Sequence, residues 1–224
     1  MGTLYIVGTP IGNLEDITKR AIRILSEVDL ILCEDTRTTK TLLEHYNIKT
    51  SLLSYHQHSK IKKIDYIIQL LREGKSLALV SDAGTPGISD PGSILVQEVT
   101  KSLSDSVKIV PIPGPTAETA IASVSGFPVN RFVFLGFPPI KNKRKKFFEE
   151  VAASKYPAIF YESPYRIIKT LQELDSLAGE LEVVVGRELT KKFETIYRGK
   201  IAEVIKKIEE DVIKGEFVVI VKSR

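Results

Sequence analysis

The first half of the chain alternates short apolar runs with amphipathic segments. Residues 4–7 (Leu-Tyr-Ile-Val) and 77–80 (Leu-Ala-Leu-Val) have little polar alternation, which is typical of strands that are buried on both faces. Between such runs, apolar residues recur at helical spacing, as in residues 61–71 before Gly74. The pattern therefore predicts a parallel sheet covered by helices. Strands are expected at 4–7, 30–33, 52–53, 77–80 and 107–110, and helices at 17–28 (capped by Asp16), 38–46, 61–71 and 94–103.

Three prolines within residues 111–115 interrupt this pattern. Such a segment fits neither a strand nor a helix, so we place a domain boundary here, with domains at 1–114 and 115–224. Beyond it, the predicted strands 181–185 and 194–197 follow each other without a helix between them, which favours a mixed or partly antiparallel sheet. Further strands are expected at 132–135, 158–161 and 217–221, and helices at 117–124, 144–153, 166–174 and 201–213.

The composition narrows the class of protein. The 224 residues are 43% hydrophobic and 27% charged, which is typical of a soluble globular protein of two domains. Cys33 is the single cysteine, so an intrachain disulfide is excluded and a reducing cytosol is favoured. No run of about 18 apolar residues is present, and the N-terminal apolar run is too short for a signal peptide. We therefore expect a cytoplasmic protein without a membrane span.

The charge is distributed unevenly. The net charge is +4, and residues 1–116 hold 13 basic and 13 acidic groups, so the whole excess lies in the second half. A cluster of basic residues at 141–146 is a candidate binding site for phosphate or nucleic acid, although a solvated helix start explains the cluster equally well. Phe147 and Phe148, which follow, either stack on bases or pack in the second core. The candidate RNA contacts are Lys141, Lys143, Arg144, Lys145 and Lys146.

Three loops follow predicted parallel strands at their carboxyl ends, where open α/β sheets bind ligands. Loop 8–13 has Gly-x-x-x-Gly, not the dinucleotide fingerprint, so a tight turn is a sufficient reading. Loop 34–37 (Glu-Asp-Thr-Arg) either carries chemistry or forms an Asp35–Arg37 ion pair that caps the next helix. Loop 81–92 contains three glycines and two prolines, so it presents backbone amides and carbonyls at fixed positions to a small polar ligand.

Other candidates are weaker. Segments 161–166 and 186–191 follow strands of the second half. His56 and His58 are candidate metal ligands, but no third ligand stands at a suitable spacing and no cysteine cluster exists, so we expect no metal. No Gly-x-Ser-x-Gly elbow and no catalytic Cys–His signature is present.

Taken together and in order, these segments resemble the tetrapyrrole methylase superfamily. The resemblance runs from Leu4 to about Val221 and rests on segments 4–13, 33–37, 81–92, 113–117, 162–166 and 187–191. Within the superfamily, the sequence is similar to the branch that methylates the 2′-hydroxyl of a cytidine in the decoding region of 16S rRNA. Porphyrin and corrin methylases and diphthine synthase have a shorter Gly-Asp-Pro loop in place of 81–92. Members of the branch often carry a further C-terminal segment, so any RNA contact from it is expected to be missing or supplied otherwise.

The resemblance implies a fold and a cofactor. It implies two α/β domains, the first with a mostly parallel sheet and the second with a mixed one, with S-adenosylmethionine (AdoMet) in the cleft between them. It also implies a homodimer and a 16S rRNA or small ribosomal subunit as partner. The residues implied as AdoMet contacts are Pro10, Ile11, Gly84, Thr85, Pro86, Gly87, Ile88, Thr116, Ala117, Tyr161, Glu188 and Gly215.

The same resemblance gives a mechanism as a hypothesis. The sulfonium activates the methyl group, so the protein must position a ribose hydroxyl and accept its proton. Of the carboxylates Glu34, Asp35, Glu162 and Glu188, we expect Asp35 to be the base, with Glu162 as a further catalytic carboxylate. Arg37 and Arg187 are expected to bind substrate phosphates, because the guanidinium fork fits phosphate.

Two alternatives stay open. A related methylase that acts on a tetrapyrrole or a protein would use the same AdoMet site and would have no need of the basic cluster. A non-catalytic RNA-binding factor of ribosome assembly would bind RNA without binding AdoMet, and would not need the stiff loop 81–92.

Overall fold

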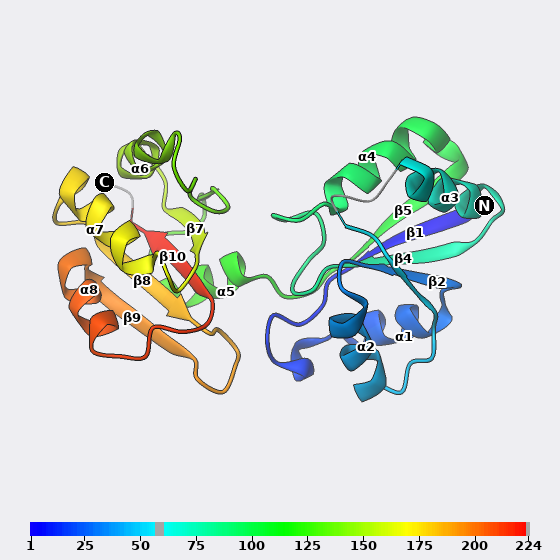
Figure 1. Ribbon diagram of the computed structural model, residues 1–224, viewed down its shortest axis with the longest axis horizontal. Helices are drawn as coiled ribbons and strands as arrows, with labels where there is room; N and C mark the ends of the chain where they lie inside the picture. Colours follow the sequence, from blue (N-terminus) through cyan, green and yellow to red (C-terminus); the bar gives the residue numbers. More distant parts are fainter. Residues whose placement is uncertain (57–60, 223–224) are drawn as a thin grey trace. The chain divides into compact units, whose positions relative to one another are not determined.

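The protein was analysed as a computed structural model that describes residues 1–56 and 61–222. The chain divides into two compact units, Met1–Thr116 and Ala117–Arg224. This division directly follows the proline-rich segment 111–115 (Figure 1). In the part of the chain that the structure describes, no helix is long and apolar enough to cross a membrane.

Unit 1 contains a five-stranded sheet in the order β3-β2-β4-β1-β5. All of its strand pairs are parallel, which confirms the prediction from the apolar runs. The strands are β1 (Gly2–Val7), β2 (Leu30–Cys33), β3 (Leu52–Ser54), β4 (Ser76–Val80) and β5 (Val107–Ile112).

Helices cover both faces of this sheet (Figure 1). Val7 of β1 packs with α1 (Lys19–Glu27) and α2 (Thr36–His45), whereas Leu4 packs with α3 (Ile61–Arg72) and α4 (Gly92–Leu103). This alternation follows from the two-residue period of a strand.

The start of α1 differs from the prediction. Asp16 does not cap it, because residues 14–16 form a separate 3₁₀ turn that the Asn13 side chain caps. Thr18 is the N-cap of α1, and its Oγ1 accepts a hydrogen bond from the Ala21 backbone at 3.0 Å. A hydroxyl at this position satisfies one of the unpaired amides of the first turn.

Unit 2 contains a mixed five-stranded sheet in the order β6-β7-β10-β8-β9. Strand β6 is parallel to β7, while β10 is antiparallel to both β7 and β8, and β8 pairs antiparallel with β9. The mixed sheet predicted from the missing helix is therefore confirmed. The strands are β6 (Val133–Phe134), β7 (Ala158–Glu162), β8 (Glu182–Arg187), β9 (Thr195–Lys200) and β10 (Phe217–Val221).

Three helices and the sheet enclose the core of unit 2. Helices α6 (Arg144–Ala153), α7 (Ile167–Ala178) and α8 (Ile201–Glu209) pack on one face of the sheet. Helix α5 (Ala117–Ser125) contacts β8 and β10, and Ile121 lies against Gly186. Helix α8 ends four residues before the predicted position, because Asp211 turns back to accept a hydrogen bond from Tyr197.

The topology fixes where the loops of interest lie. All strands of unit 1 run in the same direction, so the loops after β1, β2 and β4 leave one edge of its sheet. In unit 2, β7 and β8 are both antiparallel to β10, so β6, β7 and β8 share a direction. Their outgoing loops therefore leave one edge of the second sheet.

Candidate functional site

The loops after β1 and β4 lie at the switch point of the first sheet. These strands are neighbours, but the helices that follow them cover opposite faces. Such a point is where open α/β sheets bind ligands. The two loops are joined by an isolated antiparallel bridge, in which Thr9 N donates to Gly84 O at 2.9 Å and Gly84 N donates to Thr9 O at 3.1 Å.

A third loop, which follows β5, contacts the same place. A Cβ atom added to Gly114 would lie 2.7 Å from the Cα of Gly8, so only glycine allows this approach of two backbones. Thr85 Oγ1 donates to Pro115 O at 3.5 Å and so connects the second loop to the third. The closest contacts at the carboxyl edge of this sheet therefore join backbone to backbone, and side chains such as Thr85 add to them.

The conformation of loop 81–92 is fixed from within. One carboxylate oxygen of Asp90 accepts hydrogen bonds from Gly87 N at 2.8 Å and Gly92 N at 2.6 Å. Gly84 and Gly87 have positive φ angles of 83° and 91°, which favour glycine. Ile88 is exposed and Thr85 is half-buried, so the loop offers apolar and polar groups together.

These residues fit AdoMet, a small ligand with both charged and apolar parts. Rigid backbone amides and carbonyls suit its methionine end, and the exposed Ile88 supplies apolar surface. Pro10, Ile11, Gly84 and Pro86 are buried, while Gly87, Thr116 and Ala117 are half-buried.

Asp35, after β2, is held by Arg37. Its Oδ2 lies 2.6 Å from Arg37 Nη2, and its Oδ1 accepts from the Arg37 backbone N at 2.8 Å, which caps α2. The structure therefore contains the capping ion pair that the sequence left as an alternative. The hydrogen bonds from Arg37 lower the pKa of Asp35 to about 2, which makes it a weak base.

Glu34, one residue earlier, has a different environment. It is half-buried, and its carboxylate has no hydrogen bond or ion pair with residues 1–56 or 61–222. Burial raises the pKa of Glu34, the nearby charges of Asp82 and Asp90 raise it further, and His56 lowers it by less. Asp82 also accepts a hydrogen bond from Asp35 N at 3.0 Å, which connects the loops after β2 and β4. Glu34 therefore has the chemistry of a proton acceptor at this edge.

Glu162, at the end of β7, is enclosed by protein. Its carboxylate lies 2.7 Å from Arg166 Nη2 and accepts hydrogen bonds from Thr170 Oγ1 at 2.6 Å and Ser163 N at 2.7 Å. The side chain is completely buried. These partners give Glu162 a part in holding unit 2 together.

Arg144 belongs to the same buried network and differs from the lysines beside it. Its guanidinium donates to Glu173 at 2.7 Å, to Thr170 Oγ1 at 2.7 Å and to Pro139 O at 3.1 Å. The four neighbouring lysines are exposed; they are Lys141, Lys143, Lys145 and Lys146. Phe148 is buried and Phe147 packs against the core, as the alternative reading held.

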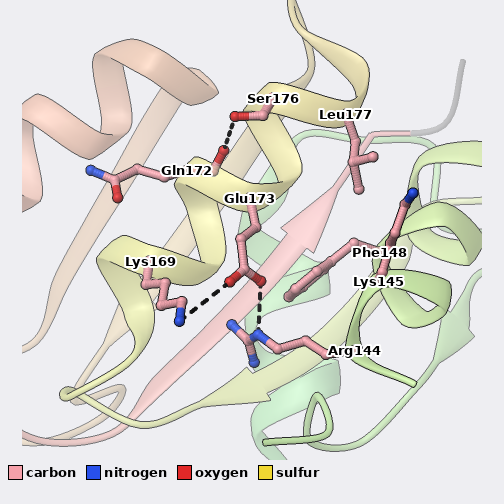
Figure 2. A pocket seen from close by; sticks show the side chains of 8 residues that line it. All are labelled: Arg144, Lys145, Phe148, Lys169, Gln172, Glu173, Ser176 and Leu177. Atoms are coloured by element: carbon pink, nitrogen blue, oxygen red, sulfur yellow. Dashed lines mark hydrogen bonds and ion pairs between the residues drawn. The ribbon is translucent and has the colours of Figure 1, made fainter. Parts of the chain in front are cut away.

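A groove of about 530 Å³ lies between α6 and α7 (Figure 2). Arg144 and Glu173 form an ion pair inside it, and the exposed Lys145 and Lys169 extend its lining. Lys169 was not predicted, because its spacing to Glu173 only indicates an ordinary helix-surface pair. The full lining is Arg144, Lys145, Phe148, Lys169, Gln172, Glu173, Ser176 and Leu177.

Arg187 is also buried. Its Nε donates to Lys214 O at 2.9 Å and its Nη1 lies 3.2 Å from Asp211 Oδ2, so its guanidinium fixes the segment that precedes β10.

Glu188 and Gly215 lie against each other. A Cβ atom on Gly215 would lie 2.4 Å from Glu188 Cδ. Glu188 Oε1 accepts hydrogen bonds from Lys191 Nζ at 2.8 Å and Glu216 N at 2.9 Å. Burial alone would raise the pKa of Glu188, but these hydrogen bonds lower it overall.

Tyr161 has a partner that the sequence reasoning missed. Its hydroxyl donates a hydrogen bond to the buried Glu118. The rings of Phe134 and Phe137 meet the Tyr161 ring edge-on, with distances between ring centres of 4.9 and 5.4 Å. Burial and the bond to Glu118 raise the pKa of Tyr161. The only signal in the sequence was an acidic residue beside Ala117, in the first turn of a predicted helix.

Among residues 1–56 and 61–222, no group of three or more His, Cys, Asp or Glu side chains is arranged to hold a metal ion. His58 lies outside the described residues, so the pairing of His56 with His58 is not described.

Residues 3–205 match the family of tetrapyrrole (corrin/porphyrin) methylases. The chain therefore belongs to this family, and the resemblance seen in the sequence is confirmed. Cobalt precorrin-4 methyltransferase shares the fold, with a TM-score of 0.69 at 18% identity over 98% of this chain and 94% of that one. Diphthine synthase also shares the fold, with a TM-score of 0.76 at 12% identity over 99% of this chain and 90% of that one.

Several relatives carry one name, Ribosomal RNA small subunit methyltransferase I. The protein of that name from Thermotoga maritima is 45% identical over 100% of both chains. The Halalkalibacterium halodurans protein is 47% identical over 99% of this chain and 76% of its own length. The Vibrio cholerae protein is 51% identical over 97% of this chain and 76% of its own length.

Proposed function

We propose that this protein transfers a methyl group from AdoMet to the ribose 2′-hydroxyl of a cytidine in the decoding region of 16S rRNA. The observation that carries the proposal is the identity of 45–51%, over nearly the whole chain, with relatives named as methyltransferases of the small-subunit rRNA. An rRNA substrate agrees with the expected cytoplasmic location. A homodimer remains a prediction from the family.

The backbone-built edge of unit 1 is the proposed site for the methionine end of AdoMet. When bound, AdoMet supplies a methyl group that its sulfonium activates for attack by an oxygen nucleophile. Gly84 to Ile88, with Pro10 and Ile11, would hold the cofactor through fixed amides and apolar contacts. Thr116 and Ala117 stay predicted contacts, as do Tyr161, Glu188 and Gly215 on the adenosine side.

The proposed proton acceptor is Glu34, in place of Asp35. The carboxylate of Asp35 is occupied by Arg37 and the α2 cap, whereas Glu34 has no such partner among the described residues. Glu34 would take the proton of the ribose hydroxyl, a role that contributes about 10²–10⁴-fold to a rate. Asp35 would position Arg37, whose guanidinium, 89% exposed, is suited to a substrate phosphate.

The proposed RNA contacts in unit 2 are exposed lysines. Lys141, Lys143, Lys145 and Lys146 present their charges to solvent, and Lys169 joins them at the groove between α6 and α7. The remaining predicted site residues are buried and hydrogen-bonded within the protein, so they would support the surface without contacting RNA. They are Arg144, Glu162 and Arg187.

The proposal is tested by offering methyl-labelled AdoMet with three acceptors: unmodified small ribosomal subunits, a tetrapyrrole precursor and total protein. We expect label only in rRNA. Label in the tetrapyrrole or in protein would favour the related methylases instead. RNA binding without any affinity for AdoMet would favour a non-catalytic assembly factor.

A charge variant tests the RNA surface separately. Replacing Lys143, Lys145 and Lys146 by serine, with Arg144 kept, should weaken subunit binding and lower its salt dependence while AdoMet affinity is unchanged. Replacing the exposed Lys19, Lys49 and Lys108 of unit 1 removes the same charge and should have little effect. Equal losses in both triple variants would contradict a localised surface.

A further inference from the structure

Three exposed aromatic side chains lie in loops at one edge of the second sheet. Phe137, Tyr165 and Phe193 have exposed fractions of 55%, 95% and 64%. They follow β6, β7 and β8, respectively. Single exposed apolar residues are common on proteins, but three large aromatic rings in three loops of one edge are a feature to explain.

The strand order sets the spacing of these loops. Strands β6 and β7 are neighbours, and only β10 separates β7 from β8. With adjacent strands about 4.8 Å apart, the loops after β7 and β8 begin roughly 10 Å from each other. A short single-stranded segment reaches across such a row, and a compact ligand does not need all three rings.

One of the rings, Phe137, is held by another ring while staying exposed, and Phe193 has a cation beside it. The Phe137 ring meets Tyr161 edge-on at 5.4 Å, and Tyr161 is itself anchored to Glu118. Lys192 Nζ lies 5.6 Å from the centre of the Phe193 ring. Fixed rings lose little conformational entropy when a ligand stacks on them.

The charges in these loops favour an anionic polymer. Lys141, Lys143 and Lys192 have no ion pair with the described residues, whereas Arg166 and Lys191 are paired with Glu162 and Glu188. In the segment before β10, Asp211 and Glu216 are paired with Arg187 and Lys191. Free cations beside exposed aromatics are the combination that binds single-stranded nucleic acid.

We propose that Phe137, Tyr165 and Phe193 form a stacking row for unpaired bases of the RNA substrate. This inference rests on the proposed function and adds the residues that bind the bases. For Phe147 and Phe148 the sequence left base stacking and packing in the core as alternatives, and both pack in the core.

The chain contains no tryptophan, so Tyr165→Trp introduces a single tryptophan at the row, whose emission can be excited separately from the tyrosines. Titration with an oligocytidylate, without AdoMet, should quench its emission as a base stacks on the indole. Tyr66→Trp, at a tyrosine of α3 that is 49% exposed, is the matched control and should not respond. Absence of quenching at position 165, with oligocytidylate bound, would overturn the proposal.

Alanine variants give the second measurement. Tyr165→Ala and Phe193→Ala should each weaken oligocytidylate binding roughly 5- to 100-fold, while Tyr165→Phe keeps wild-type affinity. AdoMet affinity should stay unchanged in all of them. Wild-type RNA affinity in the alanine variants, with methyl transfer intact, would refute the stacking row alone. Loss of AdoMet affinity would assign the rings to the cofactor, and failure of the unaltered protein to bind RNA would refute the proposed function as well.

Discussion

The edges of the two sheets are built by different means. In unit 1 the contacts run from backbone to backbone, through the Thr9–Gly84 bridge and the approach of Gly8 to Gly114. In unit 2 side chains make the contacts, as in the ion pair of the buried Glu162 with Arg166, and lysines and aromatic rings of the loops stay exposed. A rigid backbone suits one small ligand of fixed shape, whereas long side chains suit an extended and charged one. The difference matches the proposed division between cofactor and RNA.

The largest expected effect falls on the carboxylates after β2. Glu34→Gln should lower the rate of methyl transfer about 10²–10⁴-fold, because a base is lost while the shape is kept. Asp35→Asn keeps a residue able to cap α2 and should cost less. The rates are measured at saturating AdoMet and RNA, and a greater loss for Asp35→Asn would return the base to Asp35.

The pH dependence of the methyl-transfer rate gives a second test of Glu34 as the base. Burial and the charges of Asp82 and Asp90 raise the pKa of Glu34 by more than His56 lowers it, and only the ionised form of Glu34 accepts a proton. The rate should therefore rise with pH through a pKa above the ordinary glutamate value, and Glu34→Gln should remove this rise. An unchanged acidic limb in that variant would contradict the assignment.

The buried network of unit 2 should give the next largest effect, on stability. Glu162→Ala leaves Arg166 without its carboxylate partner and removes the acceptor of Thr170, so the free energy of unfolding should fall by about 3–5 kcal/mol. Denaturant unfolding measures it. Lys145→Ala, at an exposed neighbour of the network, should stay within about 0.5 kcal/mol of the parent protein. Similar values for both variants would mean that the network is not a stabilising unit.

The backbone contact of unit 1 should show a smaller loss of stability together with a loss of binding. In Gly114→Ala the added Cβ meets Gly8, and overpacking of this kind costs about 1–3 kcal/mol. AdoMet affinity, measured by calorimetry, should fall as the loops separate. Gly126→Ala is the control for binding: a Cβ there meets nothing within 4 Å, so although the φ of 76° makes alanine cost stability, the AdoMet affinity should match the parent protein.

The smallest effect is expected at the N-cap of α1, which follows the loop after β1. Thr18→Ala removes the hydroxyl that accepts from Ala21 N, which should cost about 1 kcal/mol of stability. Methyl transfer should be unchanged below the melting transition. A change in activity larger than the change in stability would show that the first loop is coupled to α1.

Local sequence patterns were enough to predict most of the fold. Apolar runs located the strands, and the missing helix between β8 and β9 indicated the mixed sheet, because both signals depend on neighbours in the sequence. The Asp16 cap was wrong because Asn13 caps a competing turn three residues earlier.

The site depended more on contacts between distant residues. Loop 81–92 was recognisable from its glycines and prolines, but the meeting of Gly8 with Gly114 joins residues over 100 positions apart. Arg144 could not be separated from the adjacent lysines, because its burial is decided by Thr170 and Glu173 on another helix. Exposure of Tyr165 likewise follows from the sheet topology.

The most direct test of the proposed activity is to locate the transferred methyl group. Unmodified small subunits are incubated with the protein and methyl-labelled AdoMet, and the 16S rRNA is then digested and mapped. We predict label on the ribose 2′-oxygen of one cytidine in the decoding region, with the adjacent phosphodiester resistant to alkali. Label on a base, or no label in RNA although AdoMet binds, would contradict the proposed reaction.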